Sequence, residues 1–178
     1  MAYELTDIVK QGGANAPGMS EQIKMCLKKD ILAFPPTTTP VVNPEDAITL
    51  DGNITFDTDF GFVNVYATKD TVRLMLKKVG QKDSRGINAE LEFFVPALHK
   101  KFAALLREDP DVVFLVKKPD CAGSEWIVLG SACRGLEING DFDSDLANNE
   151  SGRHGYTAKG QGYIPEFYFY SGTVTMKP

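Results

Sequence analysis

Much of the chain alternates apolar and polar residues with a period of two, which predicts β-strands that bury one face. Residues 23–28 alternate Ile, Met and Leu with Lys, Cys and Lys, and residues 87–93 place Ile, Ala, Leu and Phe between polar residues. Asp51-Gly52 predicts a two-residue hairpin turn between its flanking segments. The other predicted strands are 47–50, 53–57, 62–68, 71–77, 112–117, 125–129, 133–138, 156–159 and 164–170.

The period changes once, after Pro96. Leu98, Phe102, Leu105 and Leu106 are spaced as on one face of an amphipathic helix, which we expect over residues 97–108, before Pro110. One helix among about nine or ten short strands predicts a mainly β protein. The predicted fold is a β-sandwich or barrel of two packed antiparallel sheets, with one flanking α-helix and extended arms.

The chain of 178 residues has the size of one domain, and we treat 1–178 as a single β domain. Three segments lie outside the strand pattern. We expect an N-terminal arm at 1–20, an extended proline-rich arm at 35–46 and a long polar loop at 139–155. The glycine-bounded polar segment 80–86 predicts a loop between two strands.

Net charge is −5, which argues against a nucleic-acid reader, because such proteins need a basic face. Cys26, Cys121 and Cys133 are odd in number and their spacing suits neither a disulfide framework nor a zinc site. No apolar run approaches the roughly 20 residues that span a bilayer. The first residues lack the pattern of a secretion signal, so we expect synthesis in the cytoplasm and no membrane insertion.

Candidate catalytic chemistry is sparse. His99 and His154 are the two histidines, and no serine or cysteine lies in a Gly-x-Ser-x-Gly context. No phosphate-binding or dinucleotide-binding glycine motif occurs. We therefore predict a protein that is not an enzyme and holds no cofactor.

One acidic cluster resembles the opening of a calcium loop. Asp141, Asp143 and Asp145 stand at alternate positions, but a calcium loop needs Gly sixth and Glu twelfth, where this chain has Leu146 and Gly152. A solvated acidic loop is the preferred interpretation, with calcium as the weaker alternative.

Aromatic residues gather near the C terminus. In the strand expected at 164–170, Phe167 and Phe169 share one face, which we assign to the core. Tyr168 and Tyr170 share the other, which we assign to a subunit contact because exposed aromatic residues mark interfaces.

The order of these segments resembles a known family. A short N-terminal helix and a Gly-Gly break precede a strand and a proline-rich arm. A β run ending in Leu-Glu-Phe-Phe-Val-Pro (91–96), the helix, Val-Val-Phe-Leu-Val (112–116), Trp-Ile-Val-Leu-Gly-Ser (126–131) and Glu-Phe-Tyr-Phe-Tyr-Ser-Gly (166–172) follow. This order of segments resembles that of the tail tube proteins of tailed bacteriophages, particularly those of Bacteroidetes-type hosts.

The resemblance implies a structural virion protein whose copies form stacked hexameric rings. Inner strands would join into a channel through which the tape-measure protein and DNA pass, and other phage tail proteins would be partners. Loops and arms would stack the rings. The residues assigned to subunit contacts are Tyr3, Leu5, Phe34, Lys82, Arg85, Tyr168 and Tyr170. Alternatives are another ring-forming tail protein (a connector or terminator) and a β-sandwich ligand-binding module of the tail tip.

Overall fold

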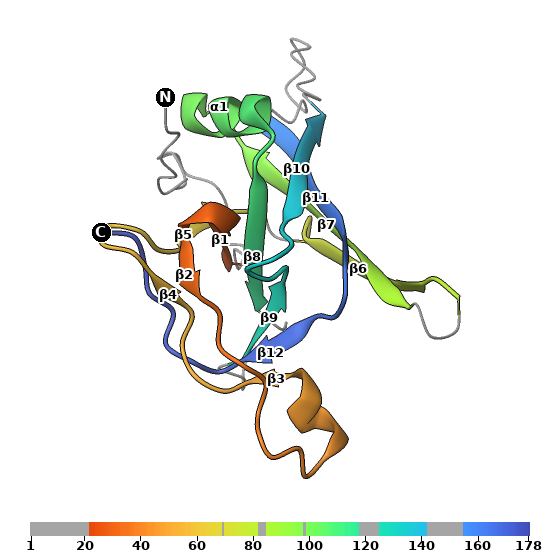
Figure 1. The fold of residues 1–178 in the computed structure, drawn as a ribbon. Helices are drawn as coiled ribbons and strands as arrows, with labels where there is room; N and C mark the ends of the chain where they lie inside the picture. Colours follow the sequence, from red (N-terminus) through yellow and green to blue (C-terminus); the bar gives the residue numbers. More distant parts are fainter. Residues whose placement is uncertain (1–21, 69, 82–84, 98, 118–124, 142–154) are drawn as a thin grey trace.

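The computed structural model describes residues 22–68, 70–81, 85–97, 99–117, 125–141 and 155–178 (Figure 1). The helices are η1 (Lys28–Asp30) and η2 (Pro44–Ile48), both 3-10, and α1 (Lys100–Glu108). The strands are β1 (Gln22–Leu27), β2 (Ile31–Ala33), β3 (Thr49–Leu50), β4 (Thr55–Phe56), β5 (Val63–Tyr66), β6 (Arg73–Val79), β7 (Gly86–Pro96), β8 (Asp111–Lys117), β9 (Trp126–Leu129), β10 (Leu136–Asp141), β11 (Gly155–Ile164) and β12 (Tyr168–Tyr170).

The strands form one large sheet and one small one. The large sheet has the order β3-β12-β9-β8-β10-β11-β7-β6, and β1 joins β8 to β5. Its pairings are antiparallel except for β12 with β3. The second sheet pairs β2 with β4. The predicted mainly β fold with one α-helix is confirmed.

β8 is the centre of the large sheet. One edge pairs with β1, and the other pairs with β10 and then β9. Its five consecutive apolar residues 112–116 are all buried. A strand that buries both faces has an unbroken apolar run, because neither face meets water.

The sheet curls around the main core. Just after β5, the N–H of Thr68 donates to the carbonyl of Phe94 in β7 at 2.9 Å, so the two sides of the sheet approach each other. The inward residues of β1, β5, β7, β8, β10 and β11 fill this core. These include the alternating residues of segments 23–28 and 87–93, whose burial was predicted.

Helix α1 lies across one end of the curled sheet (Figure 1). Its buried residues are Phe102, Leu105 and Leu106. The Phe102 ring lies 5.7 Å, centroid to centroid, from that of Tyr156 in β11. The helix begins at Lys100 rather than 97, because Pro96 ends β7 and the chain turns at Ala97 with φ +70°.

A second core packs on the outer face of β8. It contains Cys26, Leu50, Ile54, Phe62, Val113, Leu115, Val128 and Tyr170. The C-terminal residues hold down Phe62, whose N–H donates to Thr175 and whose carbonyl accepts from Lys177, both at 2.9 Å. Two packed layers therefore share β8, in agreement with the predicted architecture.

The hairpin predicted at Asp51-Gly52 is wrong. β3 pairs with the distant β12, and β4 pairs with β2. Gly52 has φ +119°, but it turns the chain so that Ile54 enters the second core. Burial of Ile54 and Leu50 there outweighs the local turn signal, because two-residue strands gain little from pairing with each other.

The C-terminal strands also differ from the prediction. The segment 156–159 belongs to the ten-residue strand β11, while 164–170 is broken at Pro165 and keeps only the three residues of β12. The full length of β11 was not predicted, because its glycines weaken the strand pattern. A Cβ at Gly160 would lie 2.5 Å from the Phe114 ring, so this glycine makes room for a core aromatic side chain.

Two predicted irregular segments are shorter or more structured than expected. The polar loop predicted at 139–155 is wrong at both ends, since β10 continues to Asp141 and β11 begins at Gly155. The arm predicted at 35–46 folds back on β3. The N–H of Thr38 donates to the Thr49 carbonyl at 2.9 Å, and η2 begins within the arm at Pro44. Residues 1–20 lie outside the described residues.

Candidate assembly surfaces and the groove beside β11

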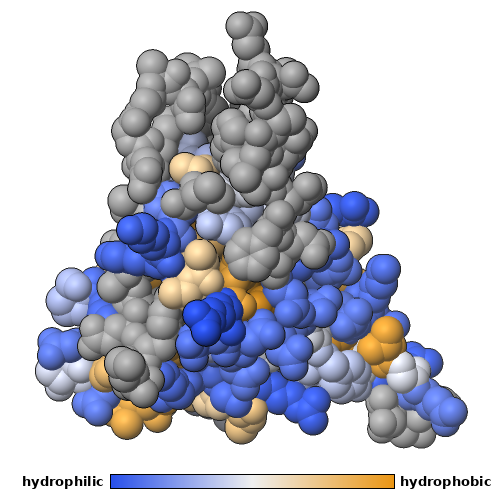
Figure 2. All heavy atoms as spheres, turned by 90° about the horizontal axis from the view of Figure 1, so that it is seen from above, coloured by the Kyte–Doolittle hydropathy of each residue, from blue (hydrophilic) through white to orange (hydrophobic). Residues whose placement is uncertain are grey.

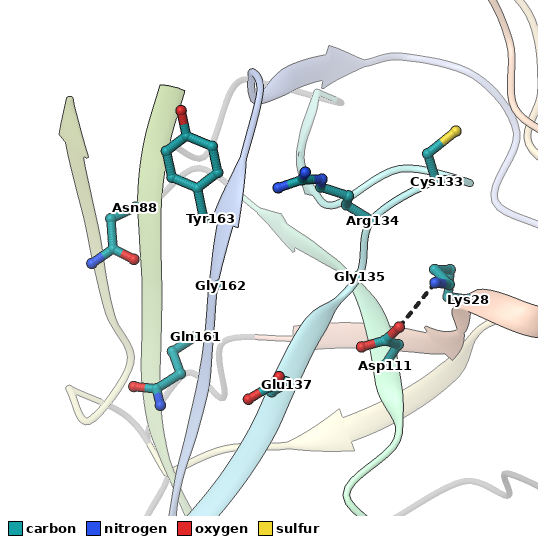
Figure 3. Close-up of a pocket in the computed structure, with 10 residues that line it drawn as sticks. All are labelled: Lys28, Asn88, Asp111, Cys133, Arg134, Gly135, Glu137, Gln161, Gly162 and Tyr163. Carbon is teal, nitrogen blue, oxygen red and sulfur yellow. Dashed lines mark ion pairs between the residues drawn. The ribbon is translucent and has the colours of Figure 1, made fainter. Parts of the chain in front are cut away.

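A surface groove of about 540 Å³ opens where β11 runs past β10 (Figure 3). β10 pairs with β11 only as far as Gln161, whereas β7 pairs with it as far as Ile164. The turn 131–135 lies across this gap. The lining residues are Lys28, Asn88, Asp111, Cys133, Arg134, Gly135, Glu137, Gln161, Gly162 and Tyr163.

Ion pairing and ring contacts order the groove. The Nζ of Lys28 lies 2.9 Å from the carboxylate of Asp111. The Arg134 guanidinium lies 5.8 Å from the centre of the Tyr163 ring, a cation–π contact. Tyr163 also covers Gly86, where a Cβ would collide with its ring. The Tyr163 ring therefore packs between Gly86 of β7 and Arg134 of the turn 131–135.

The groove carries balanced charge. Two bases, Lys28 and Arg134, and two acids, Asp111 and Glu137, line it together with amide side chains. Such a lining offers both donors and acceptors to an uncharged polar group. The Cys133 thiol is exposed at its rim, and no histidine is among the described lining residues.

Two predicted contact residues lie against each other. Phe34 and Tyr168 meet edge to face with ring centroids 6.0 Å apart, and both are partly buried against the second core. Burial, together with the nearby charge of Glu166, raises the pKa of Tyr168. The structure thus gives both rings a role inside the subunit, with a part of each left at the surface.

The assignment of Tyr170 to a subunit contact is wrong, because this side chain is fully buried. Its hydroxyl donates to the Thr173 carbonyl at 2.6 Å and accepts from the Ile54 N–H at 3.4 Å. Phe167 and Phe169 are only partly buried. The sequence analysis therefore placed the wrong face of β12 in the core. The second core lies on the face that carries the tyrosines, and the Tyr170 hydroxyl finds both hydrogen-bond partners there.

Of the other predicted residues, Arg85 is exposed just before β7. Tyr3, Leu5 and Lys82 lie outside the described residues, as do Asp143 and Asp145. Asp141 ends β10, and its side chain is not among those described. Within the described ranges, no three histidine, cysteine or carboxylate side chains are grouped as metal ligands.

Two segments that the sequence identified, the proline-rich arm and the loop 80–86, lie on parts of the fold that project from its body. The arm 37–48 leaves the body at one end, and the β6–β7 hairpin stands out at one side (Figure 1). Val41 and Val42 on the arm are 58% and 78% exposed, and Val79 on the hairpin is 37% exposed. Seen from above, the described surface is mostly hydrophilic, with a few hydrophobic groups (Figure 2).

Comparison with known proteins identifies no relative: no family model, curated protein or solved structure matches the chain. Among the described residues, no helix has the length and apolar character needed to cross a membrane.

Proposed function

We propose that this chain is a structural, non-catalytic subunit of a bacteriophage tail tube. Its copies form stacked hexameric rings around a channel that conducts DNA. The observation that carries the proposal is the terminal position of β6, a seven-residue strand that ends the described path of the large sheet. A terminal strand offers backbone donors and acceptors to another chain, and closing a ring pairs such edges.

The outer face next to β6 supports an aqueous channel wall. Arg73 in β6 stands opposite Glu92 in β7, which stands opposite Lys159 in β11. The Lys159 Nζ lies 3.8 Å from the Glu92 carboxylate. Opposite charges in register leave a polar face with little net attraction for phosphate, as a DNA-conducting surface requires. We assign this face to the channel.

The virion is the site of action in this proposal. Other tail proteins bind the ends of the tube, and the tape-measure protein and DNA pass through it without sequence-specific contacts. The chain is made in the host cytoplasm. A connector or terminator would use the same edges but stop at one ring.

The groove beside β11 favours a second candidate function, a ligand-binding module of the tail tip. Its charge-balanced lining and exposed Tyr163 suit an uncharged, hydroxyl-rich ligand. Binding of a neutral oligosaccharide on a glycan array, lost in Tyr163→Ala, would favour this candidate.

Sedimentation velocity of the purified full chain over a 100-fold range of concentration tests the proposal. We expect a discrete ring species and then fast-sedimenting polymers as concentration rises. A discrete ring that never grows would indicate a connector or terminator. A monomer at every concentration would contradict assembly and leave the binding module as the better function.

A further inference from the structure

Charge is segregated along the chain. Residues 31–68 contain five acidic residues and no lysine or arginine, whereas residues 73–88 contain five basic residues and one acidic residue. Part of each stretch lies on its own projection from the body of the fold (Figure 1). We call residues 41–51 the acidic arm, and residues 77–81 together with 85–88 the basic hairpin.

The acidic arm is held in shape by its own contacts. The Asp46 carboxylate accepts hydrogen bonds from the N–H groups of Val42 and Asn43, both at 2.8 Å, which lowers the pKa of this group. The side chains of Glu45 and Asp51 are exposed. The arm thus presents a preformed surface with carboxylates beside two exposed valines.

The basic hairpin presents the opposite charge. Lys77, Lys78 and Arg85 are exposed, and Val79 and Tyr163 add exposed apolar surface beside them. The β6–β7 register holds Lys77 opposite Asn88 and Lys78 opposite Ile87, so no acid faces either lysine across the hairpin. Among the described residues, each projection therefore combines exposed apolar side chains with charge of a single sign.

We propose that the basic hairpin of one copy docks on the acidic arm of the next copy. This inference rests on the proposed function and names the contact that would join neighbouring subunits. A second copy fits because it carries the complementary charge and the matching apolar residues. The contact joins two different surfaces of the chain, so it can repeat head-to-tail from each copy to the next. Head-to-tail contacts close into rings or continue as helical tubes.

Two charge-reversal variants of the full chain test the contact. Lys77→Glu with Lys78→Glu makes the hairpin acidic, and Glu45→Lys with Asp51→Lys makes the arm basic. Each variant alone carries projections of like charge. In an equal mixture, every acidic hairpin can meet a basic arm, and every basic hairpin an acidic arm. Sedimentation velocity at low and high salt measures association.

We expect each variant alone to associate at least ~10-fold more weakly than the wild type, and the mixture to regain wild-type association. Association of the wild type should weaken between 50 and 500 mM salt, as screening shortens the reach of charges. The control Lys100→Glu with Lys101→Glu changes net charge as the hairpin variant does, but on α1, and should associate like the wild type.

Wild-type association of either variant alone, or a mixture no better than its components, would overturn the contact. If the wild type forms tubes and the swap has no effect, the tube proposal stands and this contact falls. If the mixture associates in the expected pairs but no tube forms, the contact stands and the tube proposal falls.

Discussion

Removing the hydroxyl of Tyr170 tests whether β12 is packed as described. In Tyr170→Phe the ring stays in the second core, but the bonds to the Thr173 carbonyl and the Ile54 N–H are lost. The first bond is short and worth about 1 kcal/mol net. The second is long, but Ile54 is 1% exposed, so its N–H loses a partner in a site that excludes water. Together we expect a loss of about 1–2 kcal/mol.

Urea unfolding followed by circular dichroism measures this change, and the corresponding fall in Tm should be about 2–8 °C. Tyr163→Phe is the matched control, because the Tyr163 side chain is 43% exposed and its hydroxyl can be solvated. The control should change stability by less than about 0.5 kcal/mol. If Tyr170→Phe is as stable as the control, the buried hydroxyl network does not exist as described.

Tyr170 should also make the free energy of unfolding depend on pH. Burial raises the pKa of Tyr170 above its ordinary value, although the Ile54 N–H opposes this. Above a pH of about 10 the unfolded chain releases the phenol proton while the folded chain keeps it. The unfolded state then binds fewer protons, so stability falls as pH rises. This alkaline loss should be smaller in Tyr170→Phe.

Three further substitutions test other parts of the fold. Phe102→Ala should lower the free energy of unfolding in urea by about 3–5 kcal/mol, because it removes the ring that α1 buries. Arg107→Ala, on the exposed side of α1, should lower it by less than about 0.5 kcal/mol. Equal losses would contradict the packing of α1. Gly86→Ala should lower Tm, because its new Cβ meets the Tyr163 ring, and adding Tyr163→Ala should recover part of the loss; strictly additive losses would exclude the clash. Burial raises the pKa of the Cys26 thiol well above its ordinary value, so the free energy of unfolding should fall as pH rises above about 9. Cys26→Ala should lack this fall. An unchanged pH profile would show that the thiol is accessible.

The main core could be predicted from the sequence because its strands carry unambiguous patterns. Alternation in β7 and the unbroken apolar run of β8 each have one structural solution, a strand with one or two buried faces. The spacing of Phe102, Leu105 and Leu106 likewise indicated α1. In these elements local pattern and tertiary packing agree.

The second core could not be predicted in the same way. β12 has three residues, too few to show which phase of its alternation is buried, and the answer depends on Leu50 and Ile54 more than 100 residues earlier. The pairing of β3 with β12 overrides the Asp51-Gly52 turn for the same reason. The length of β11 was underestimated, because its glycines make room for the neighbouring rings of Phe94 and Phe114.

The candidate surfaces were only partly visible in the sequence. The loop 80–86 and the arm were identified as segments, but their projection from the body depends on topology. The groove is lined by residues from β7, β8, β10, β11, η1 and the turn 131–135, and these segments are spread widely along the sequence. No local sequence motif therefore predicted the groove.

Negative-stain electron microscopy of the purified full chain, with light scattering on the same sample, tests the central claim most directly. The account predicts hollow rings that stack into tubes as concentration rises. Uniform compact particles of monomer size, at concentrations up to the limit of solubility, would contradict the claim that this β domain is the subunit of a tail tube.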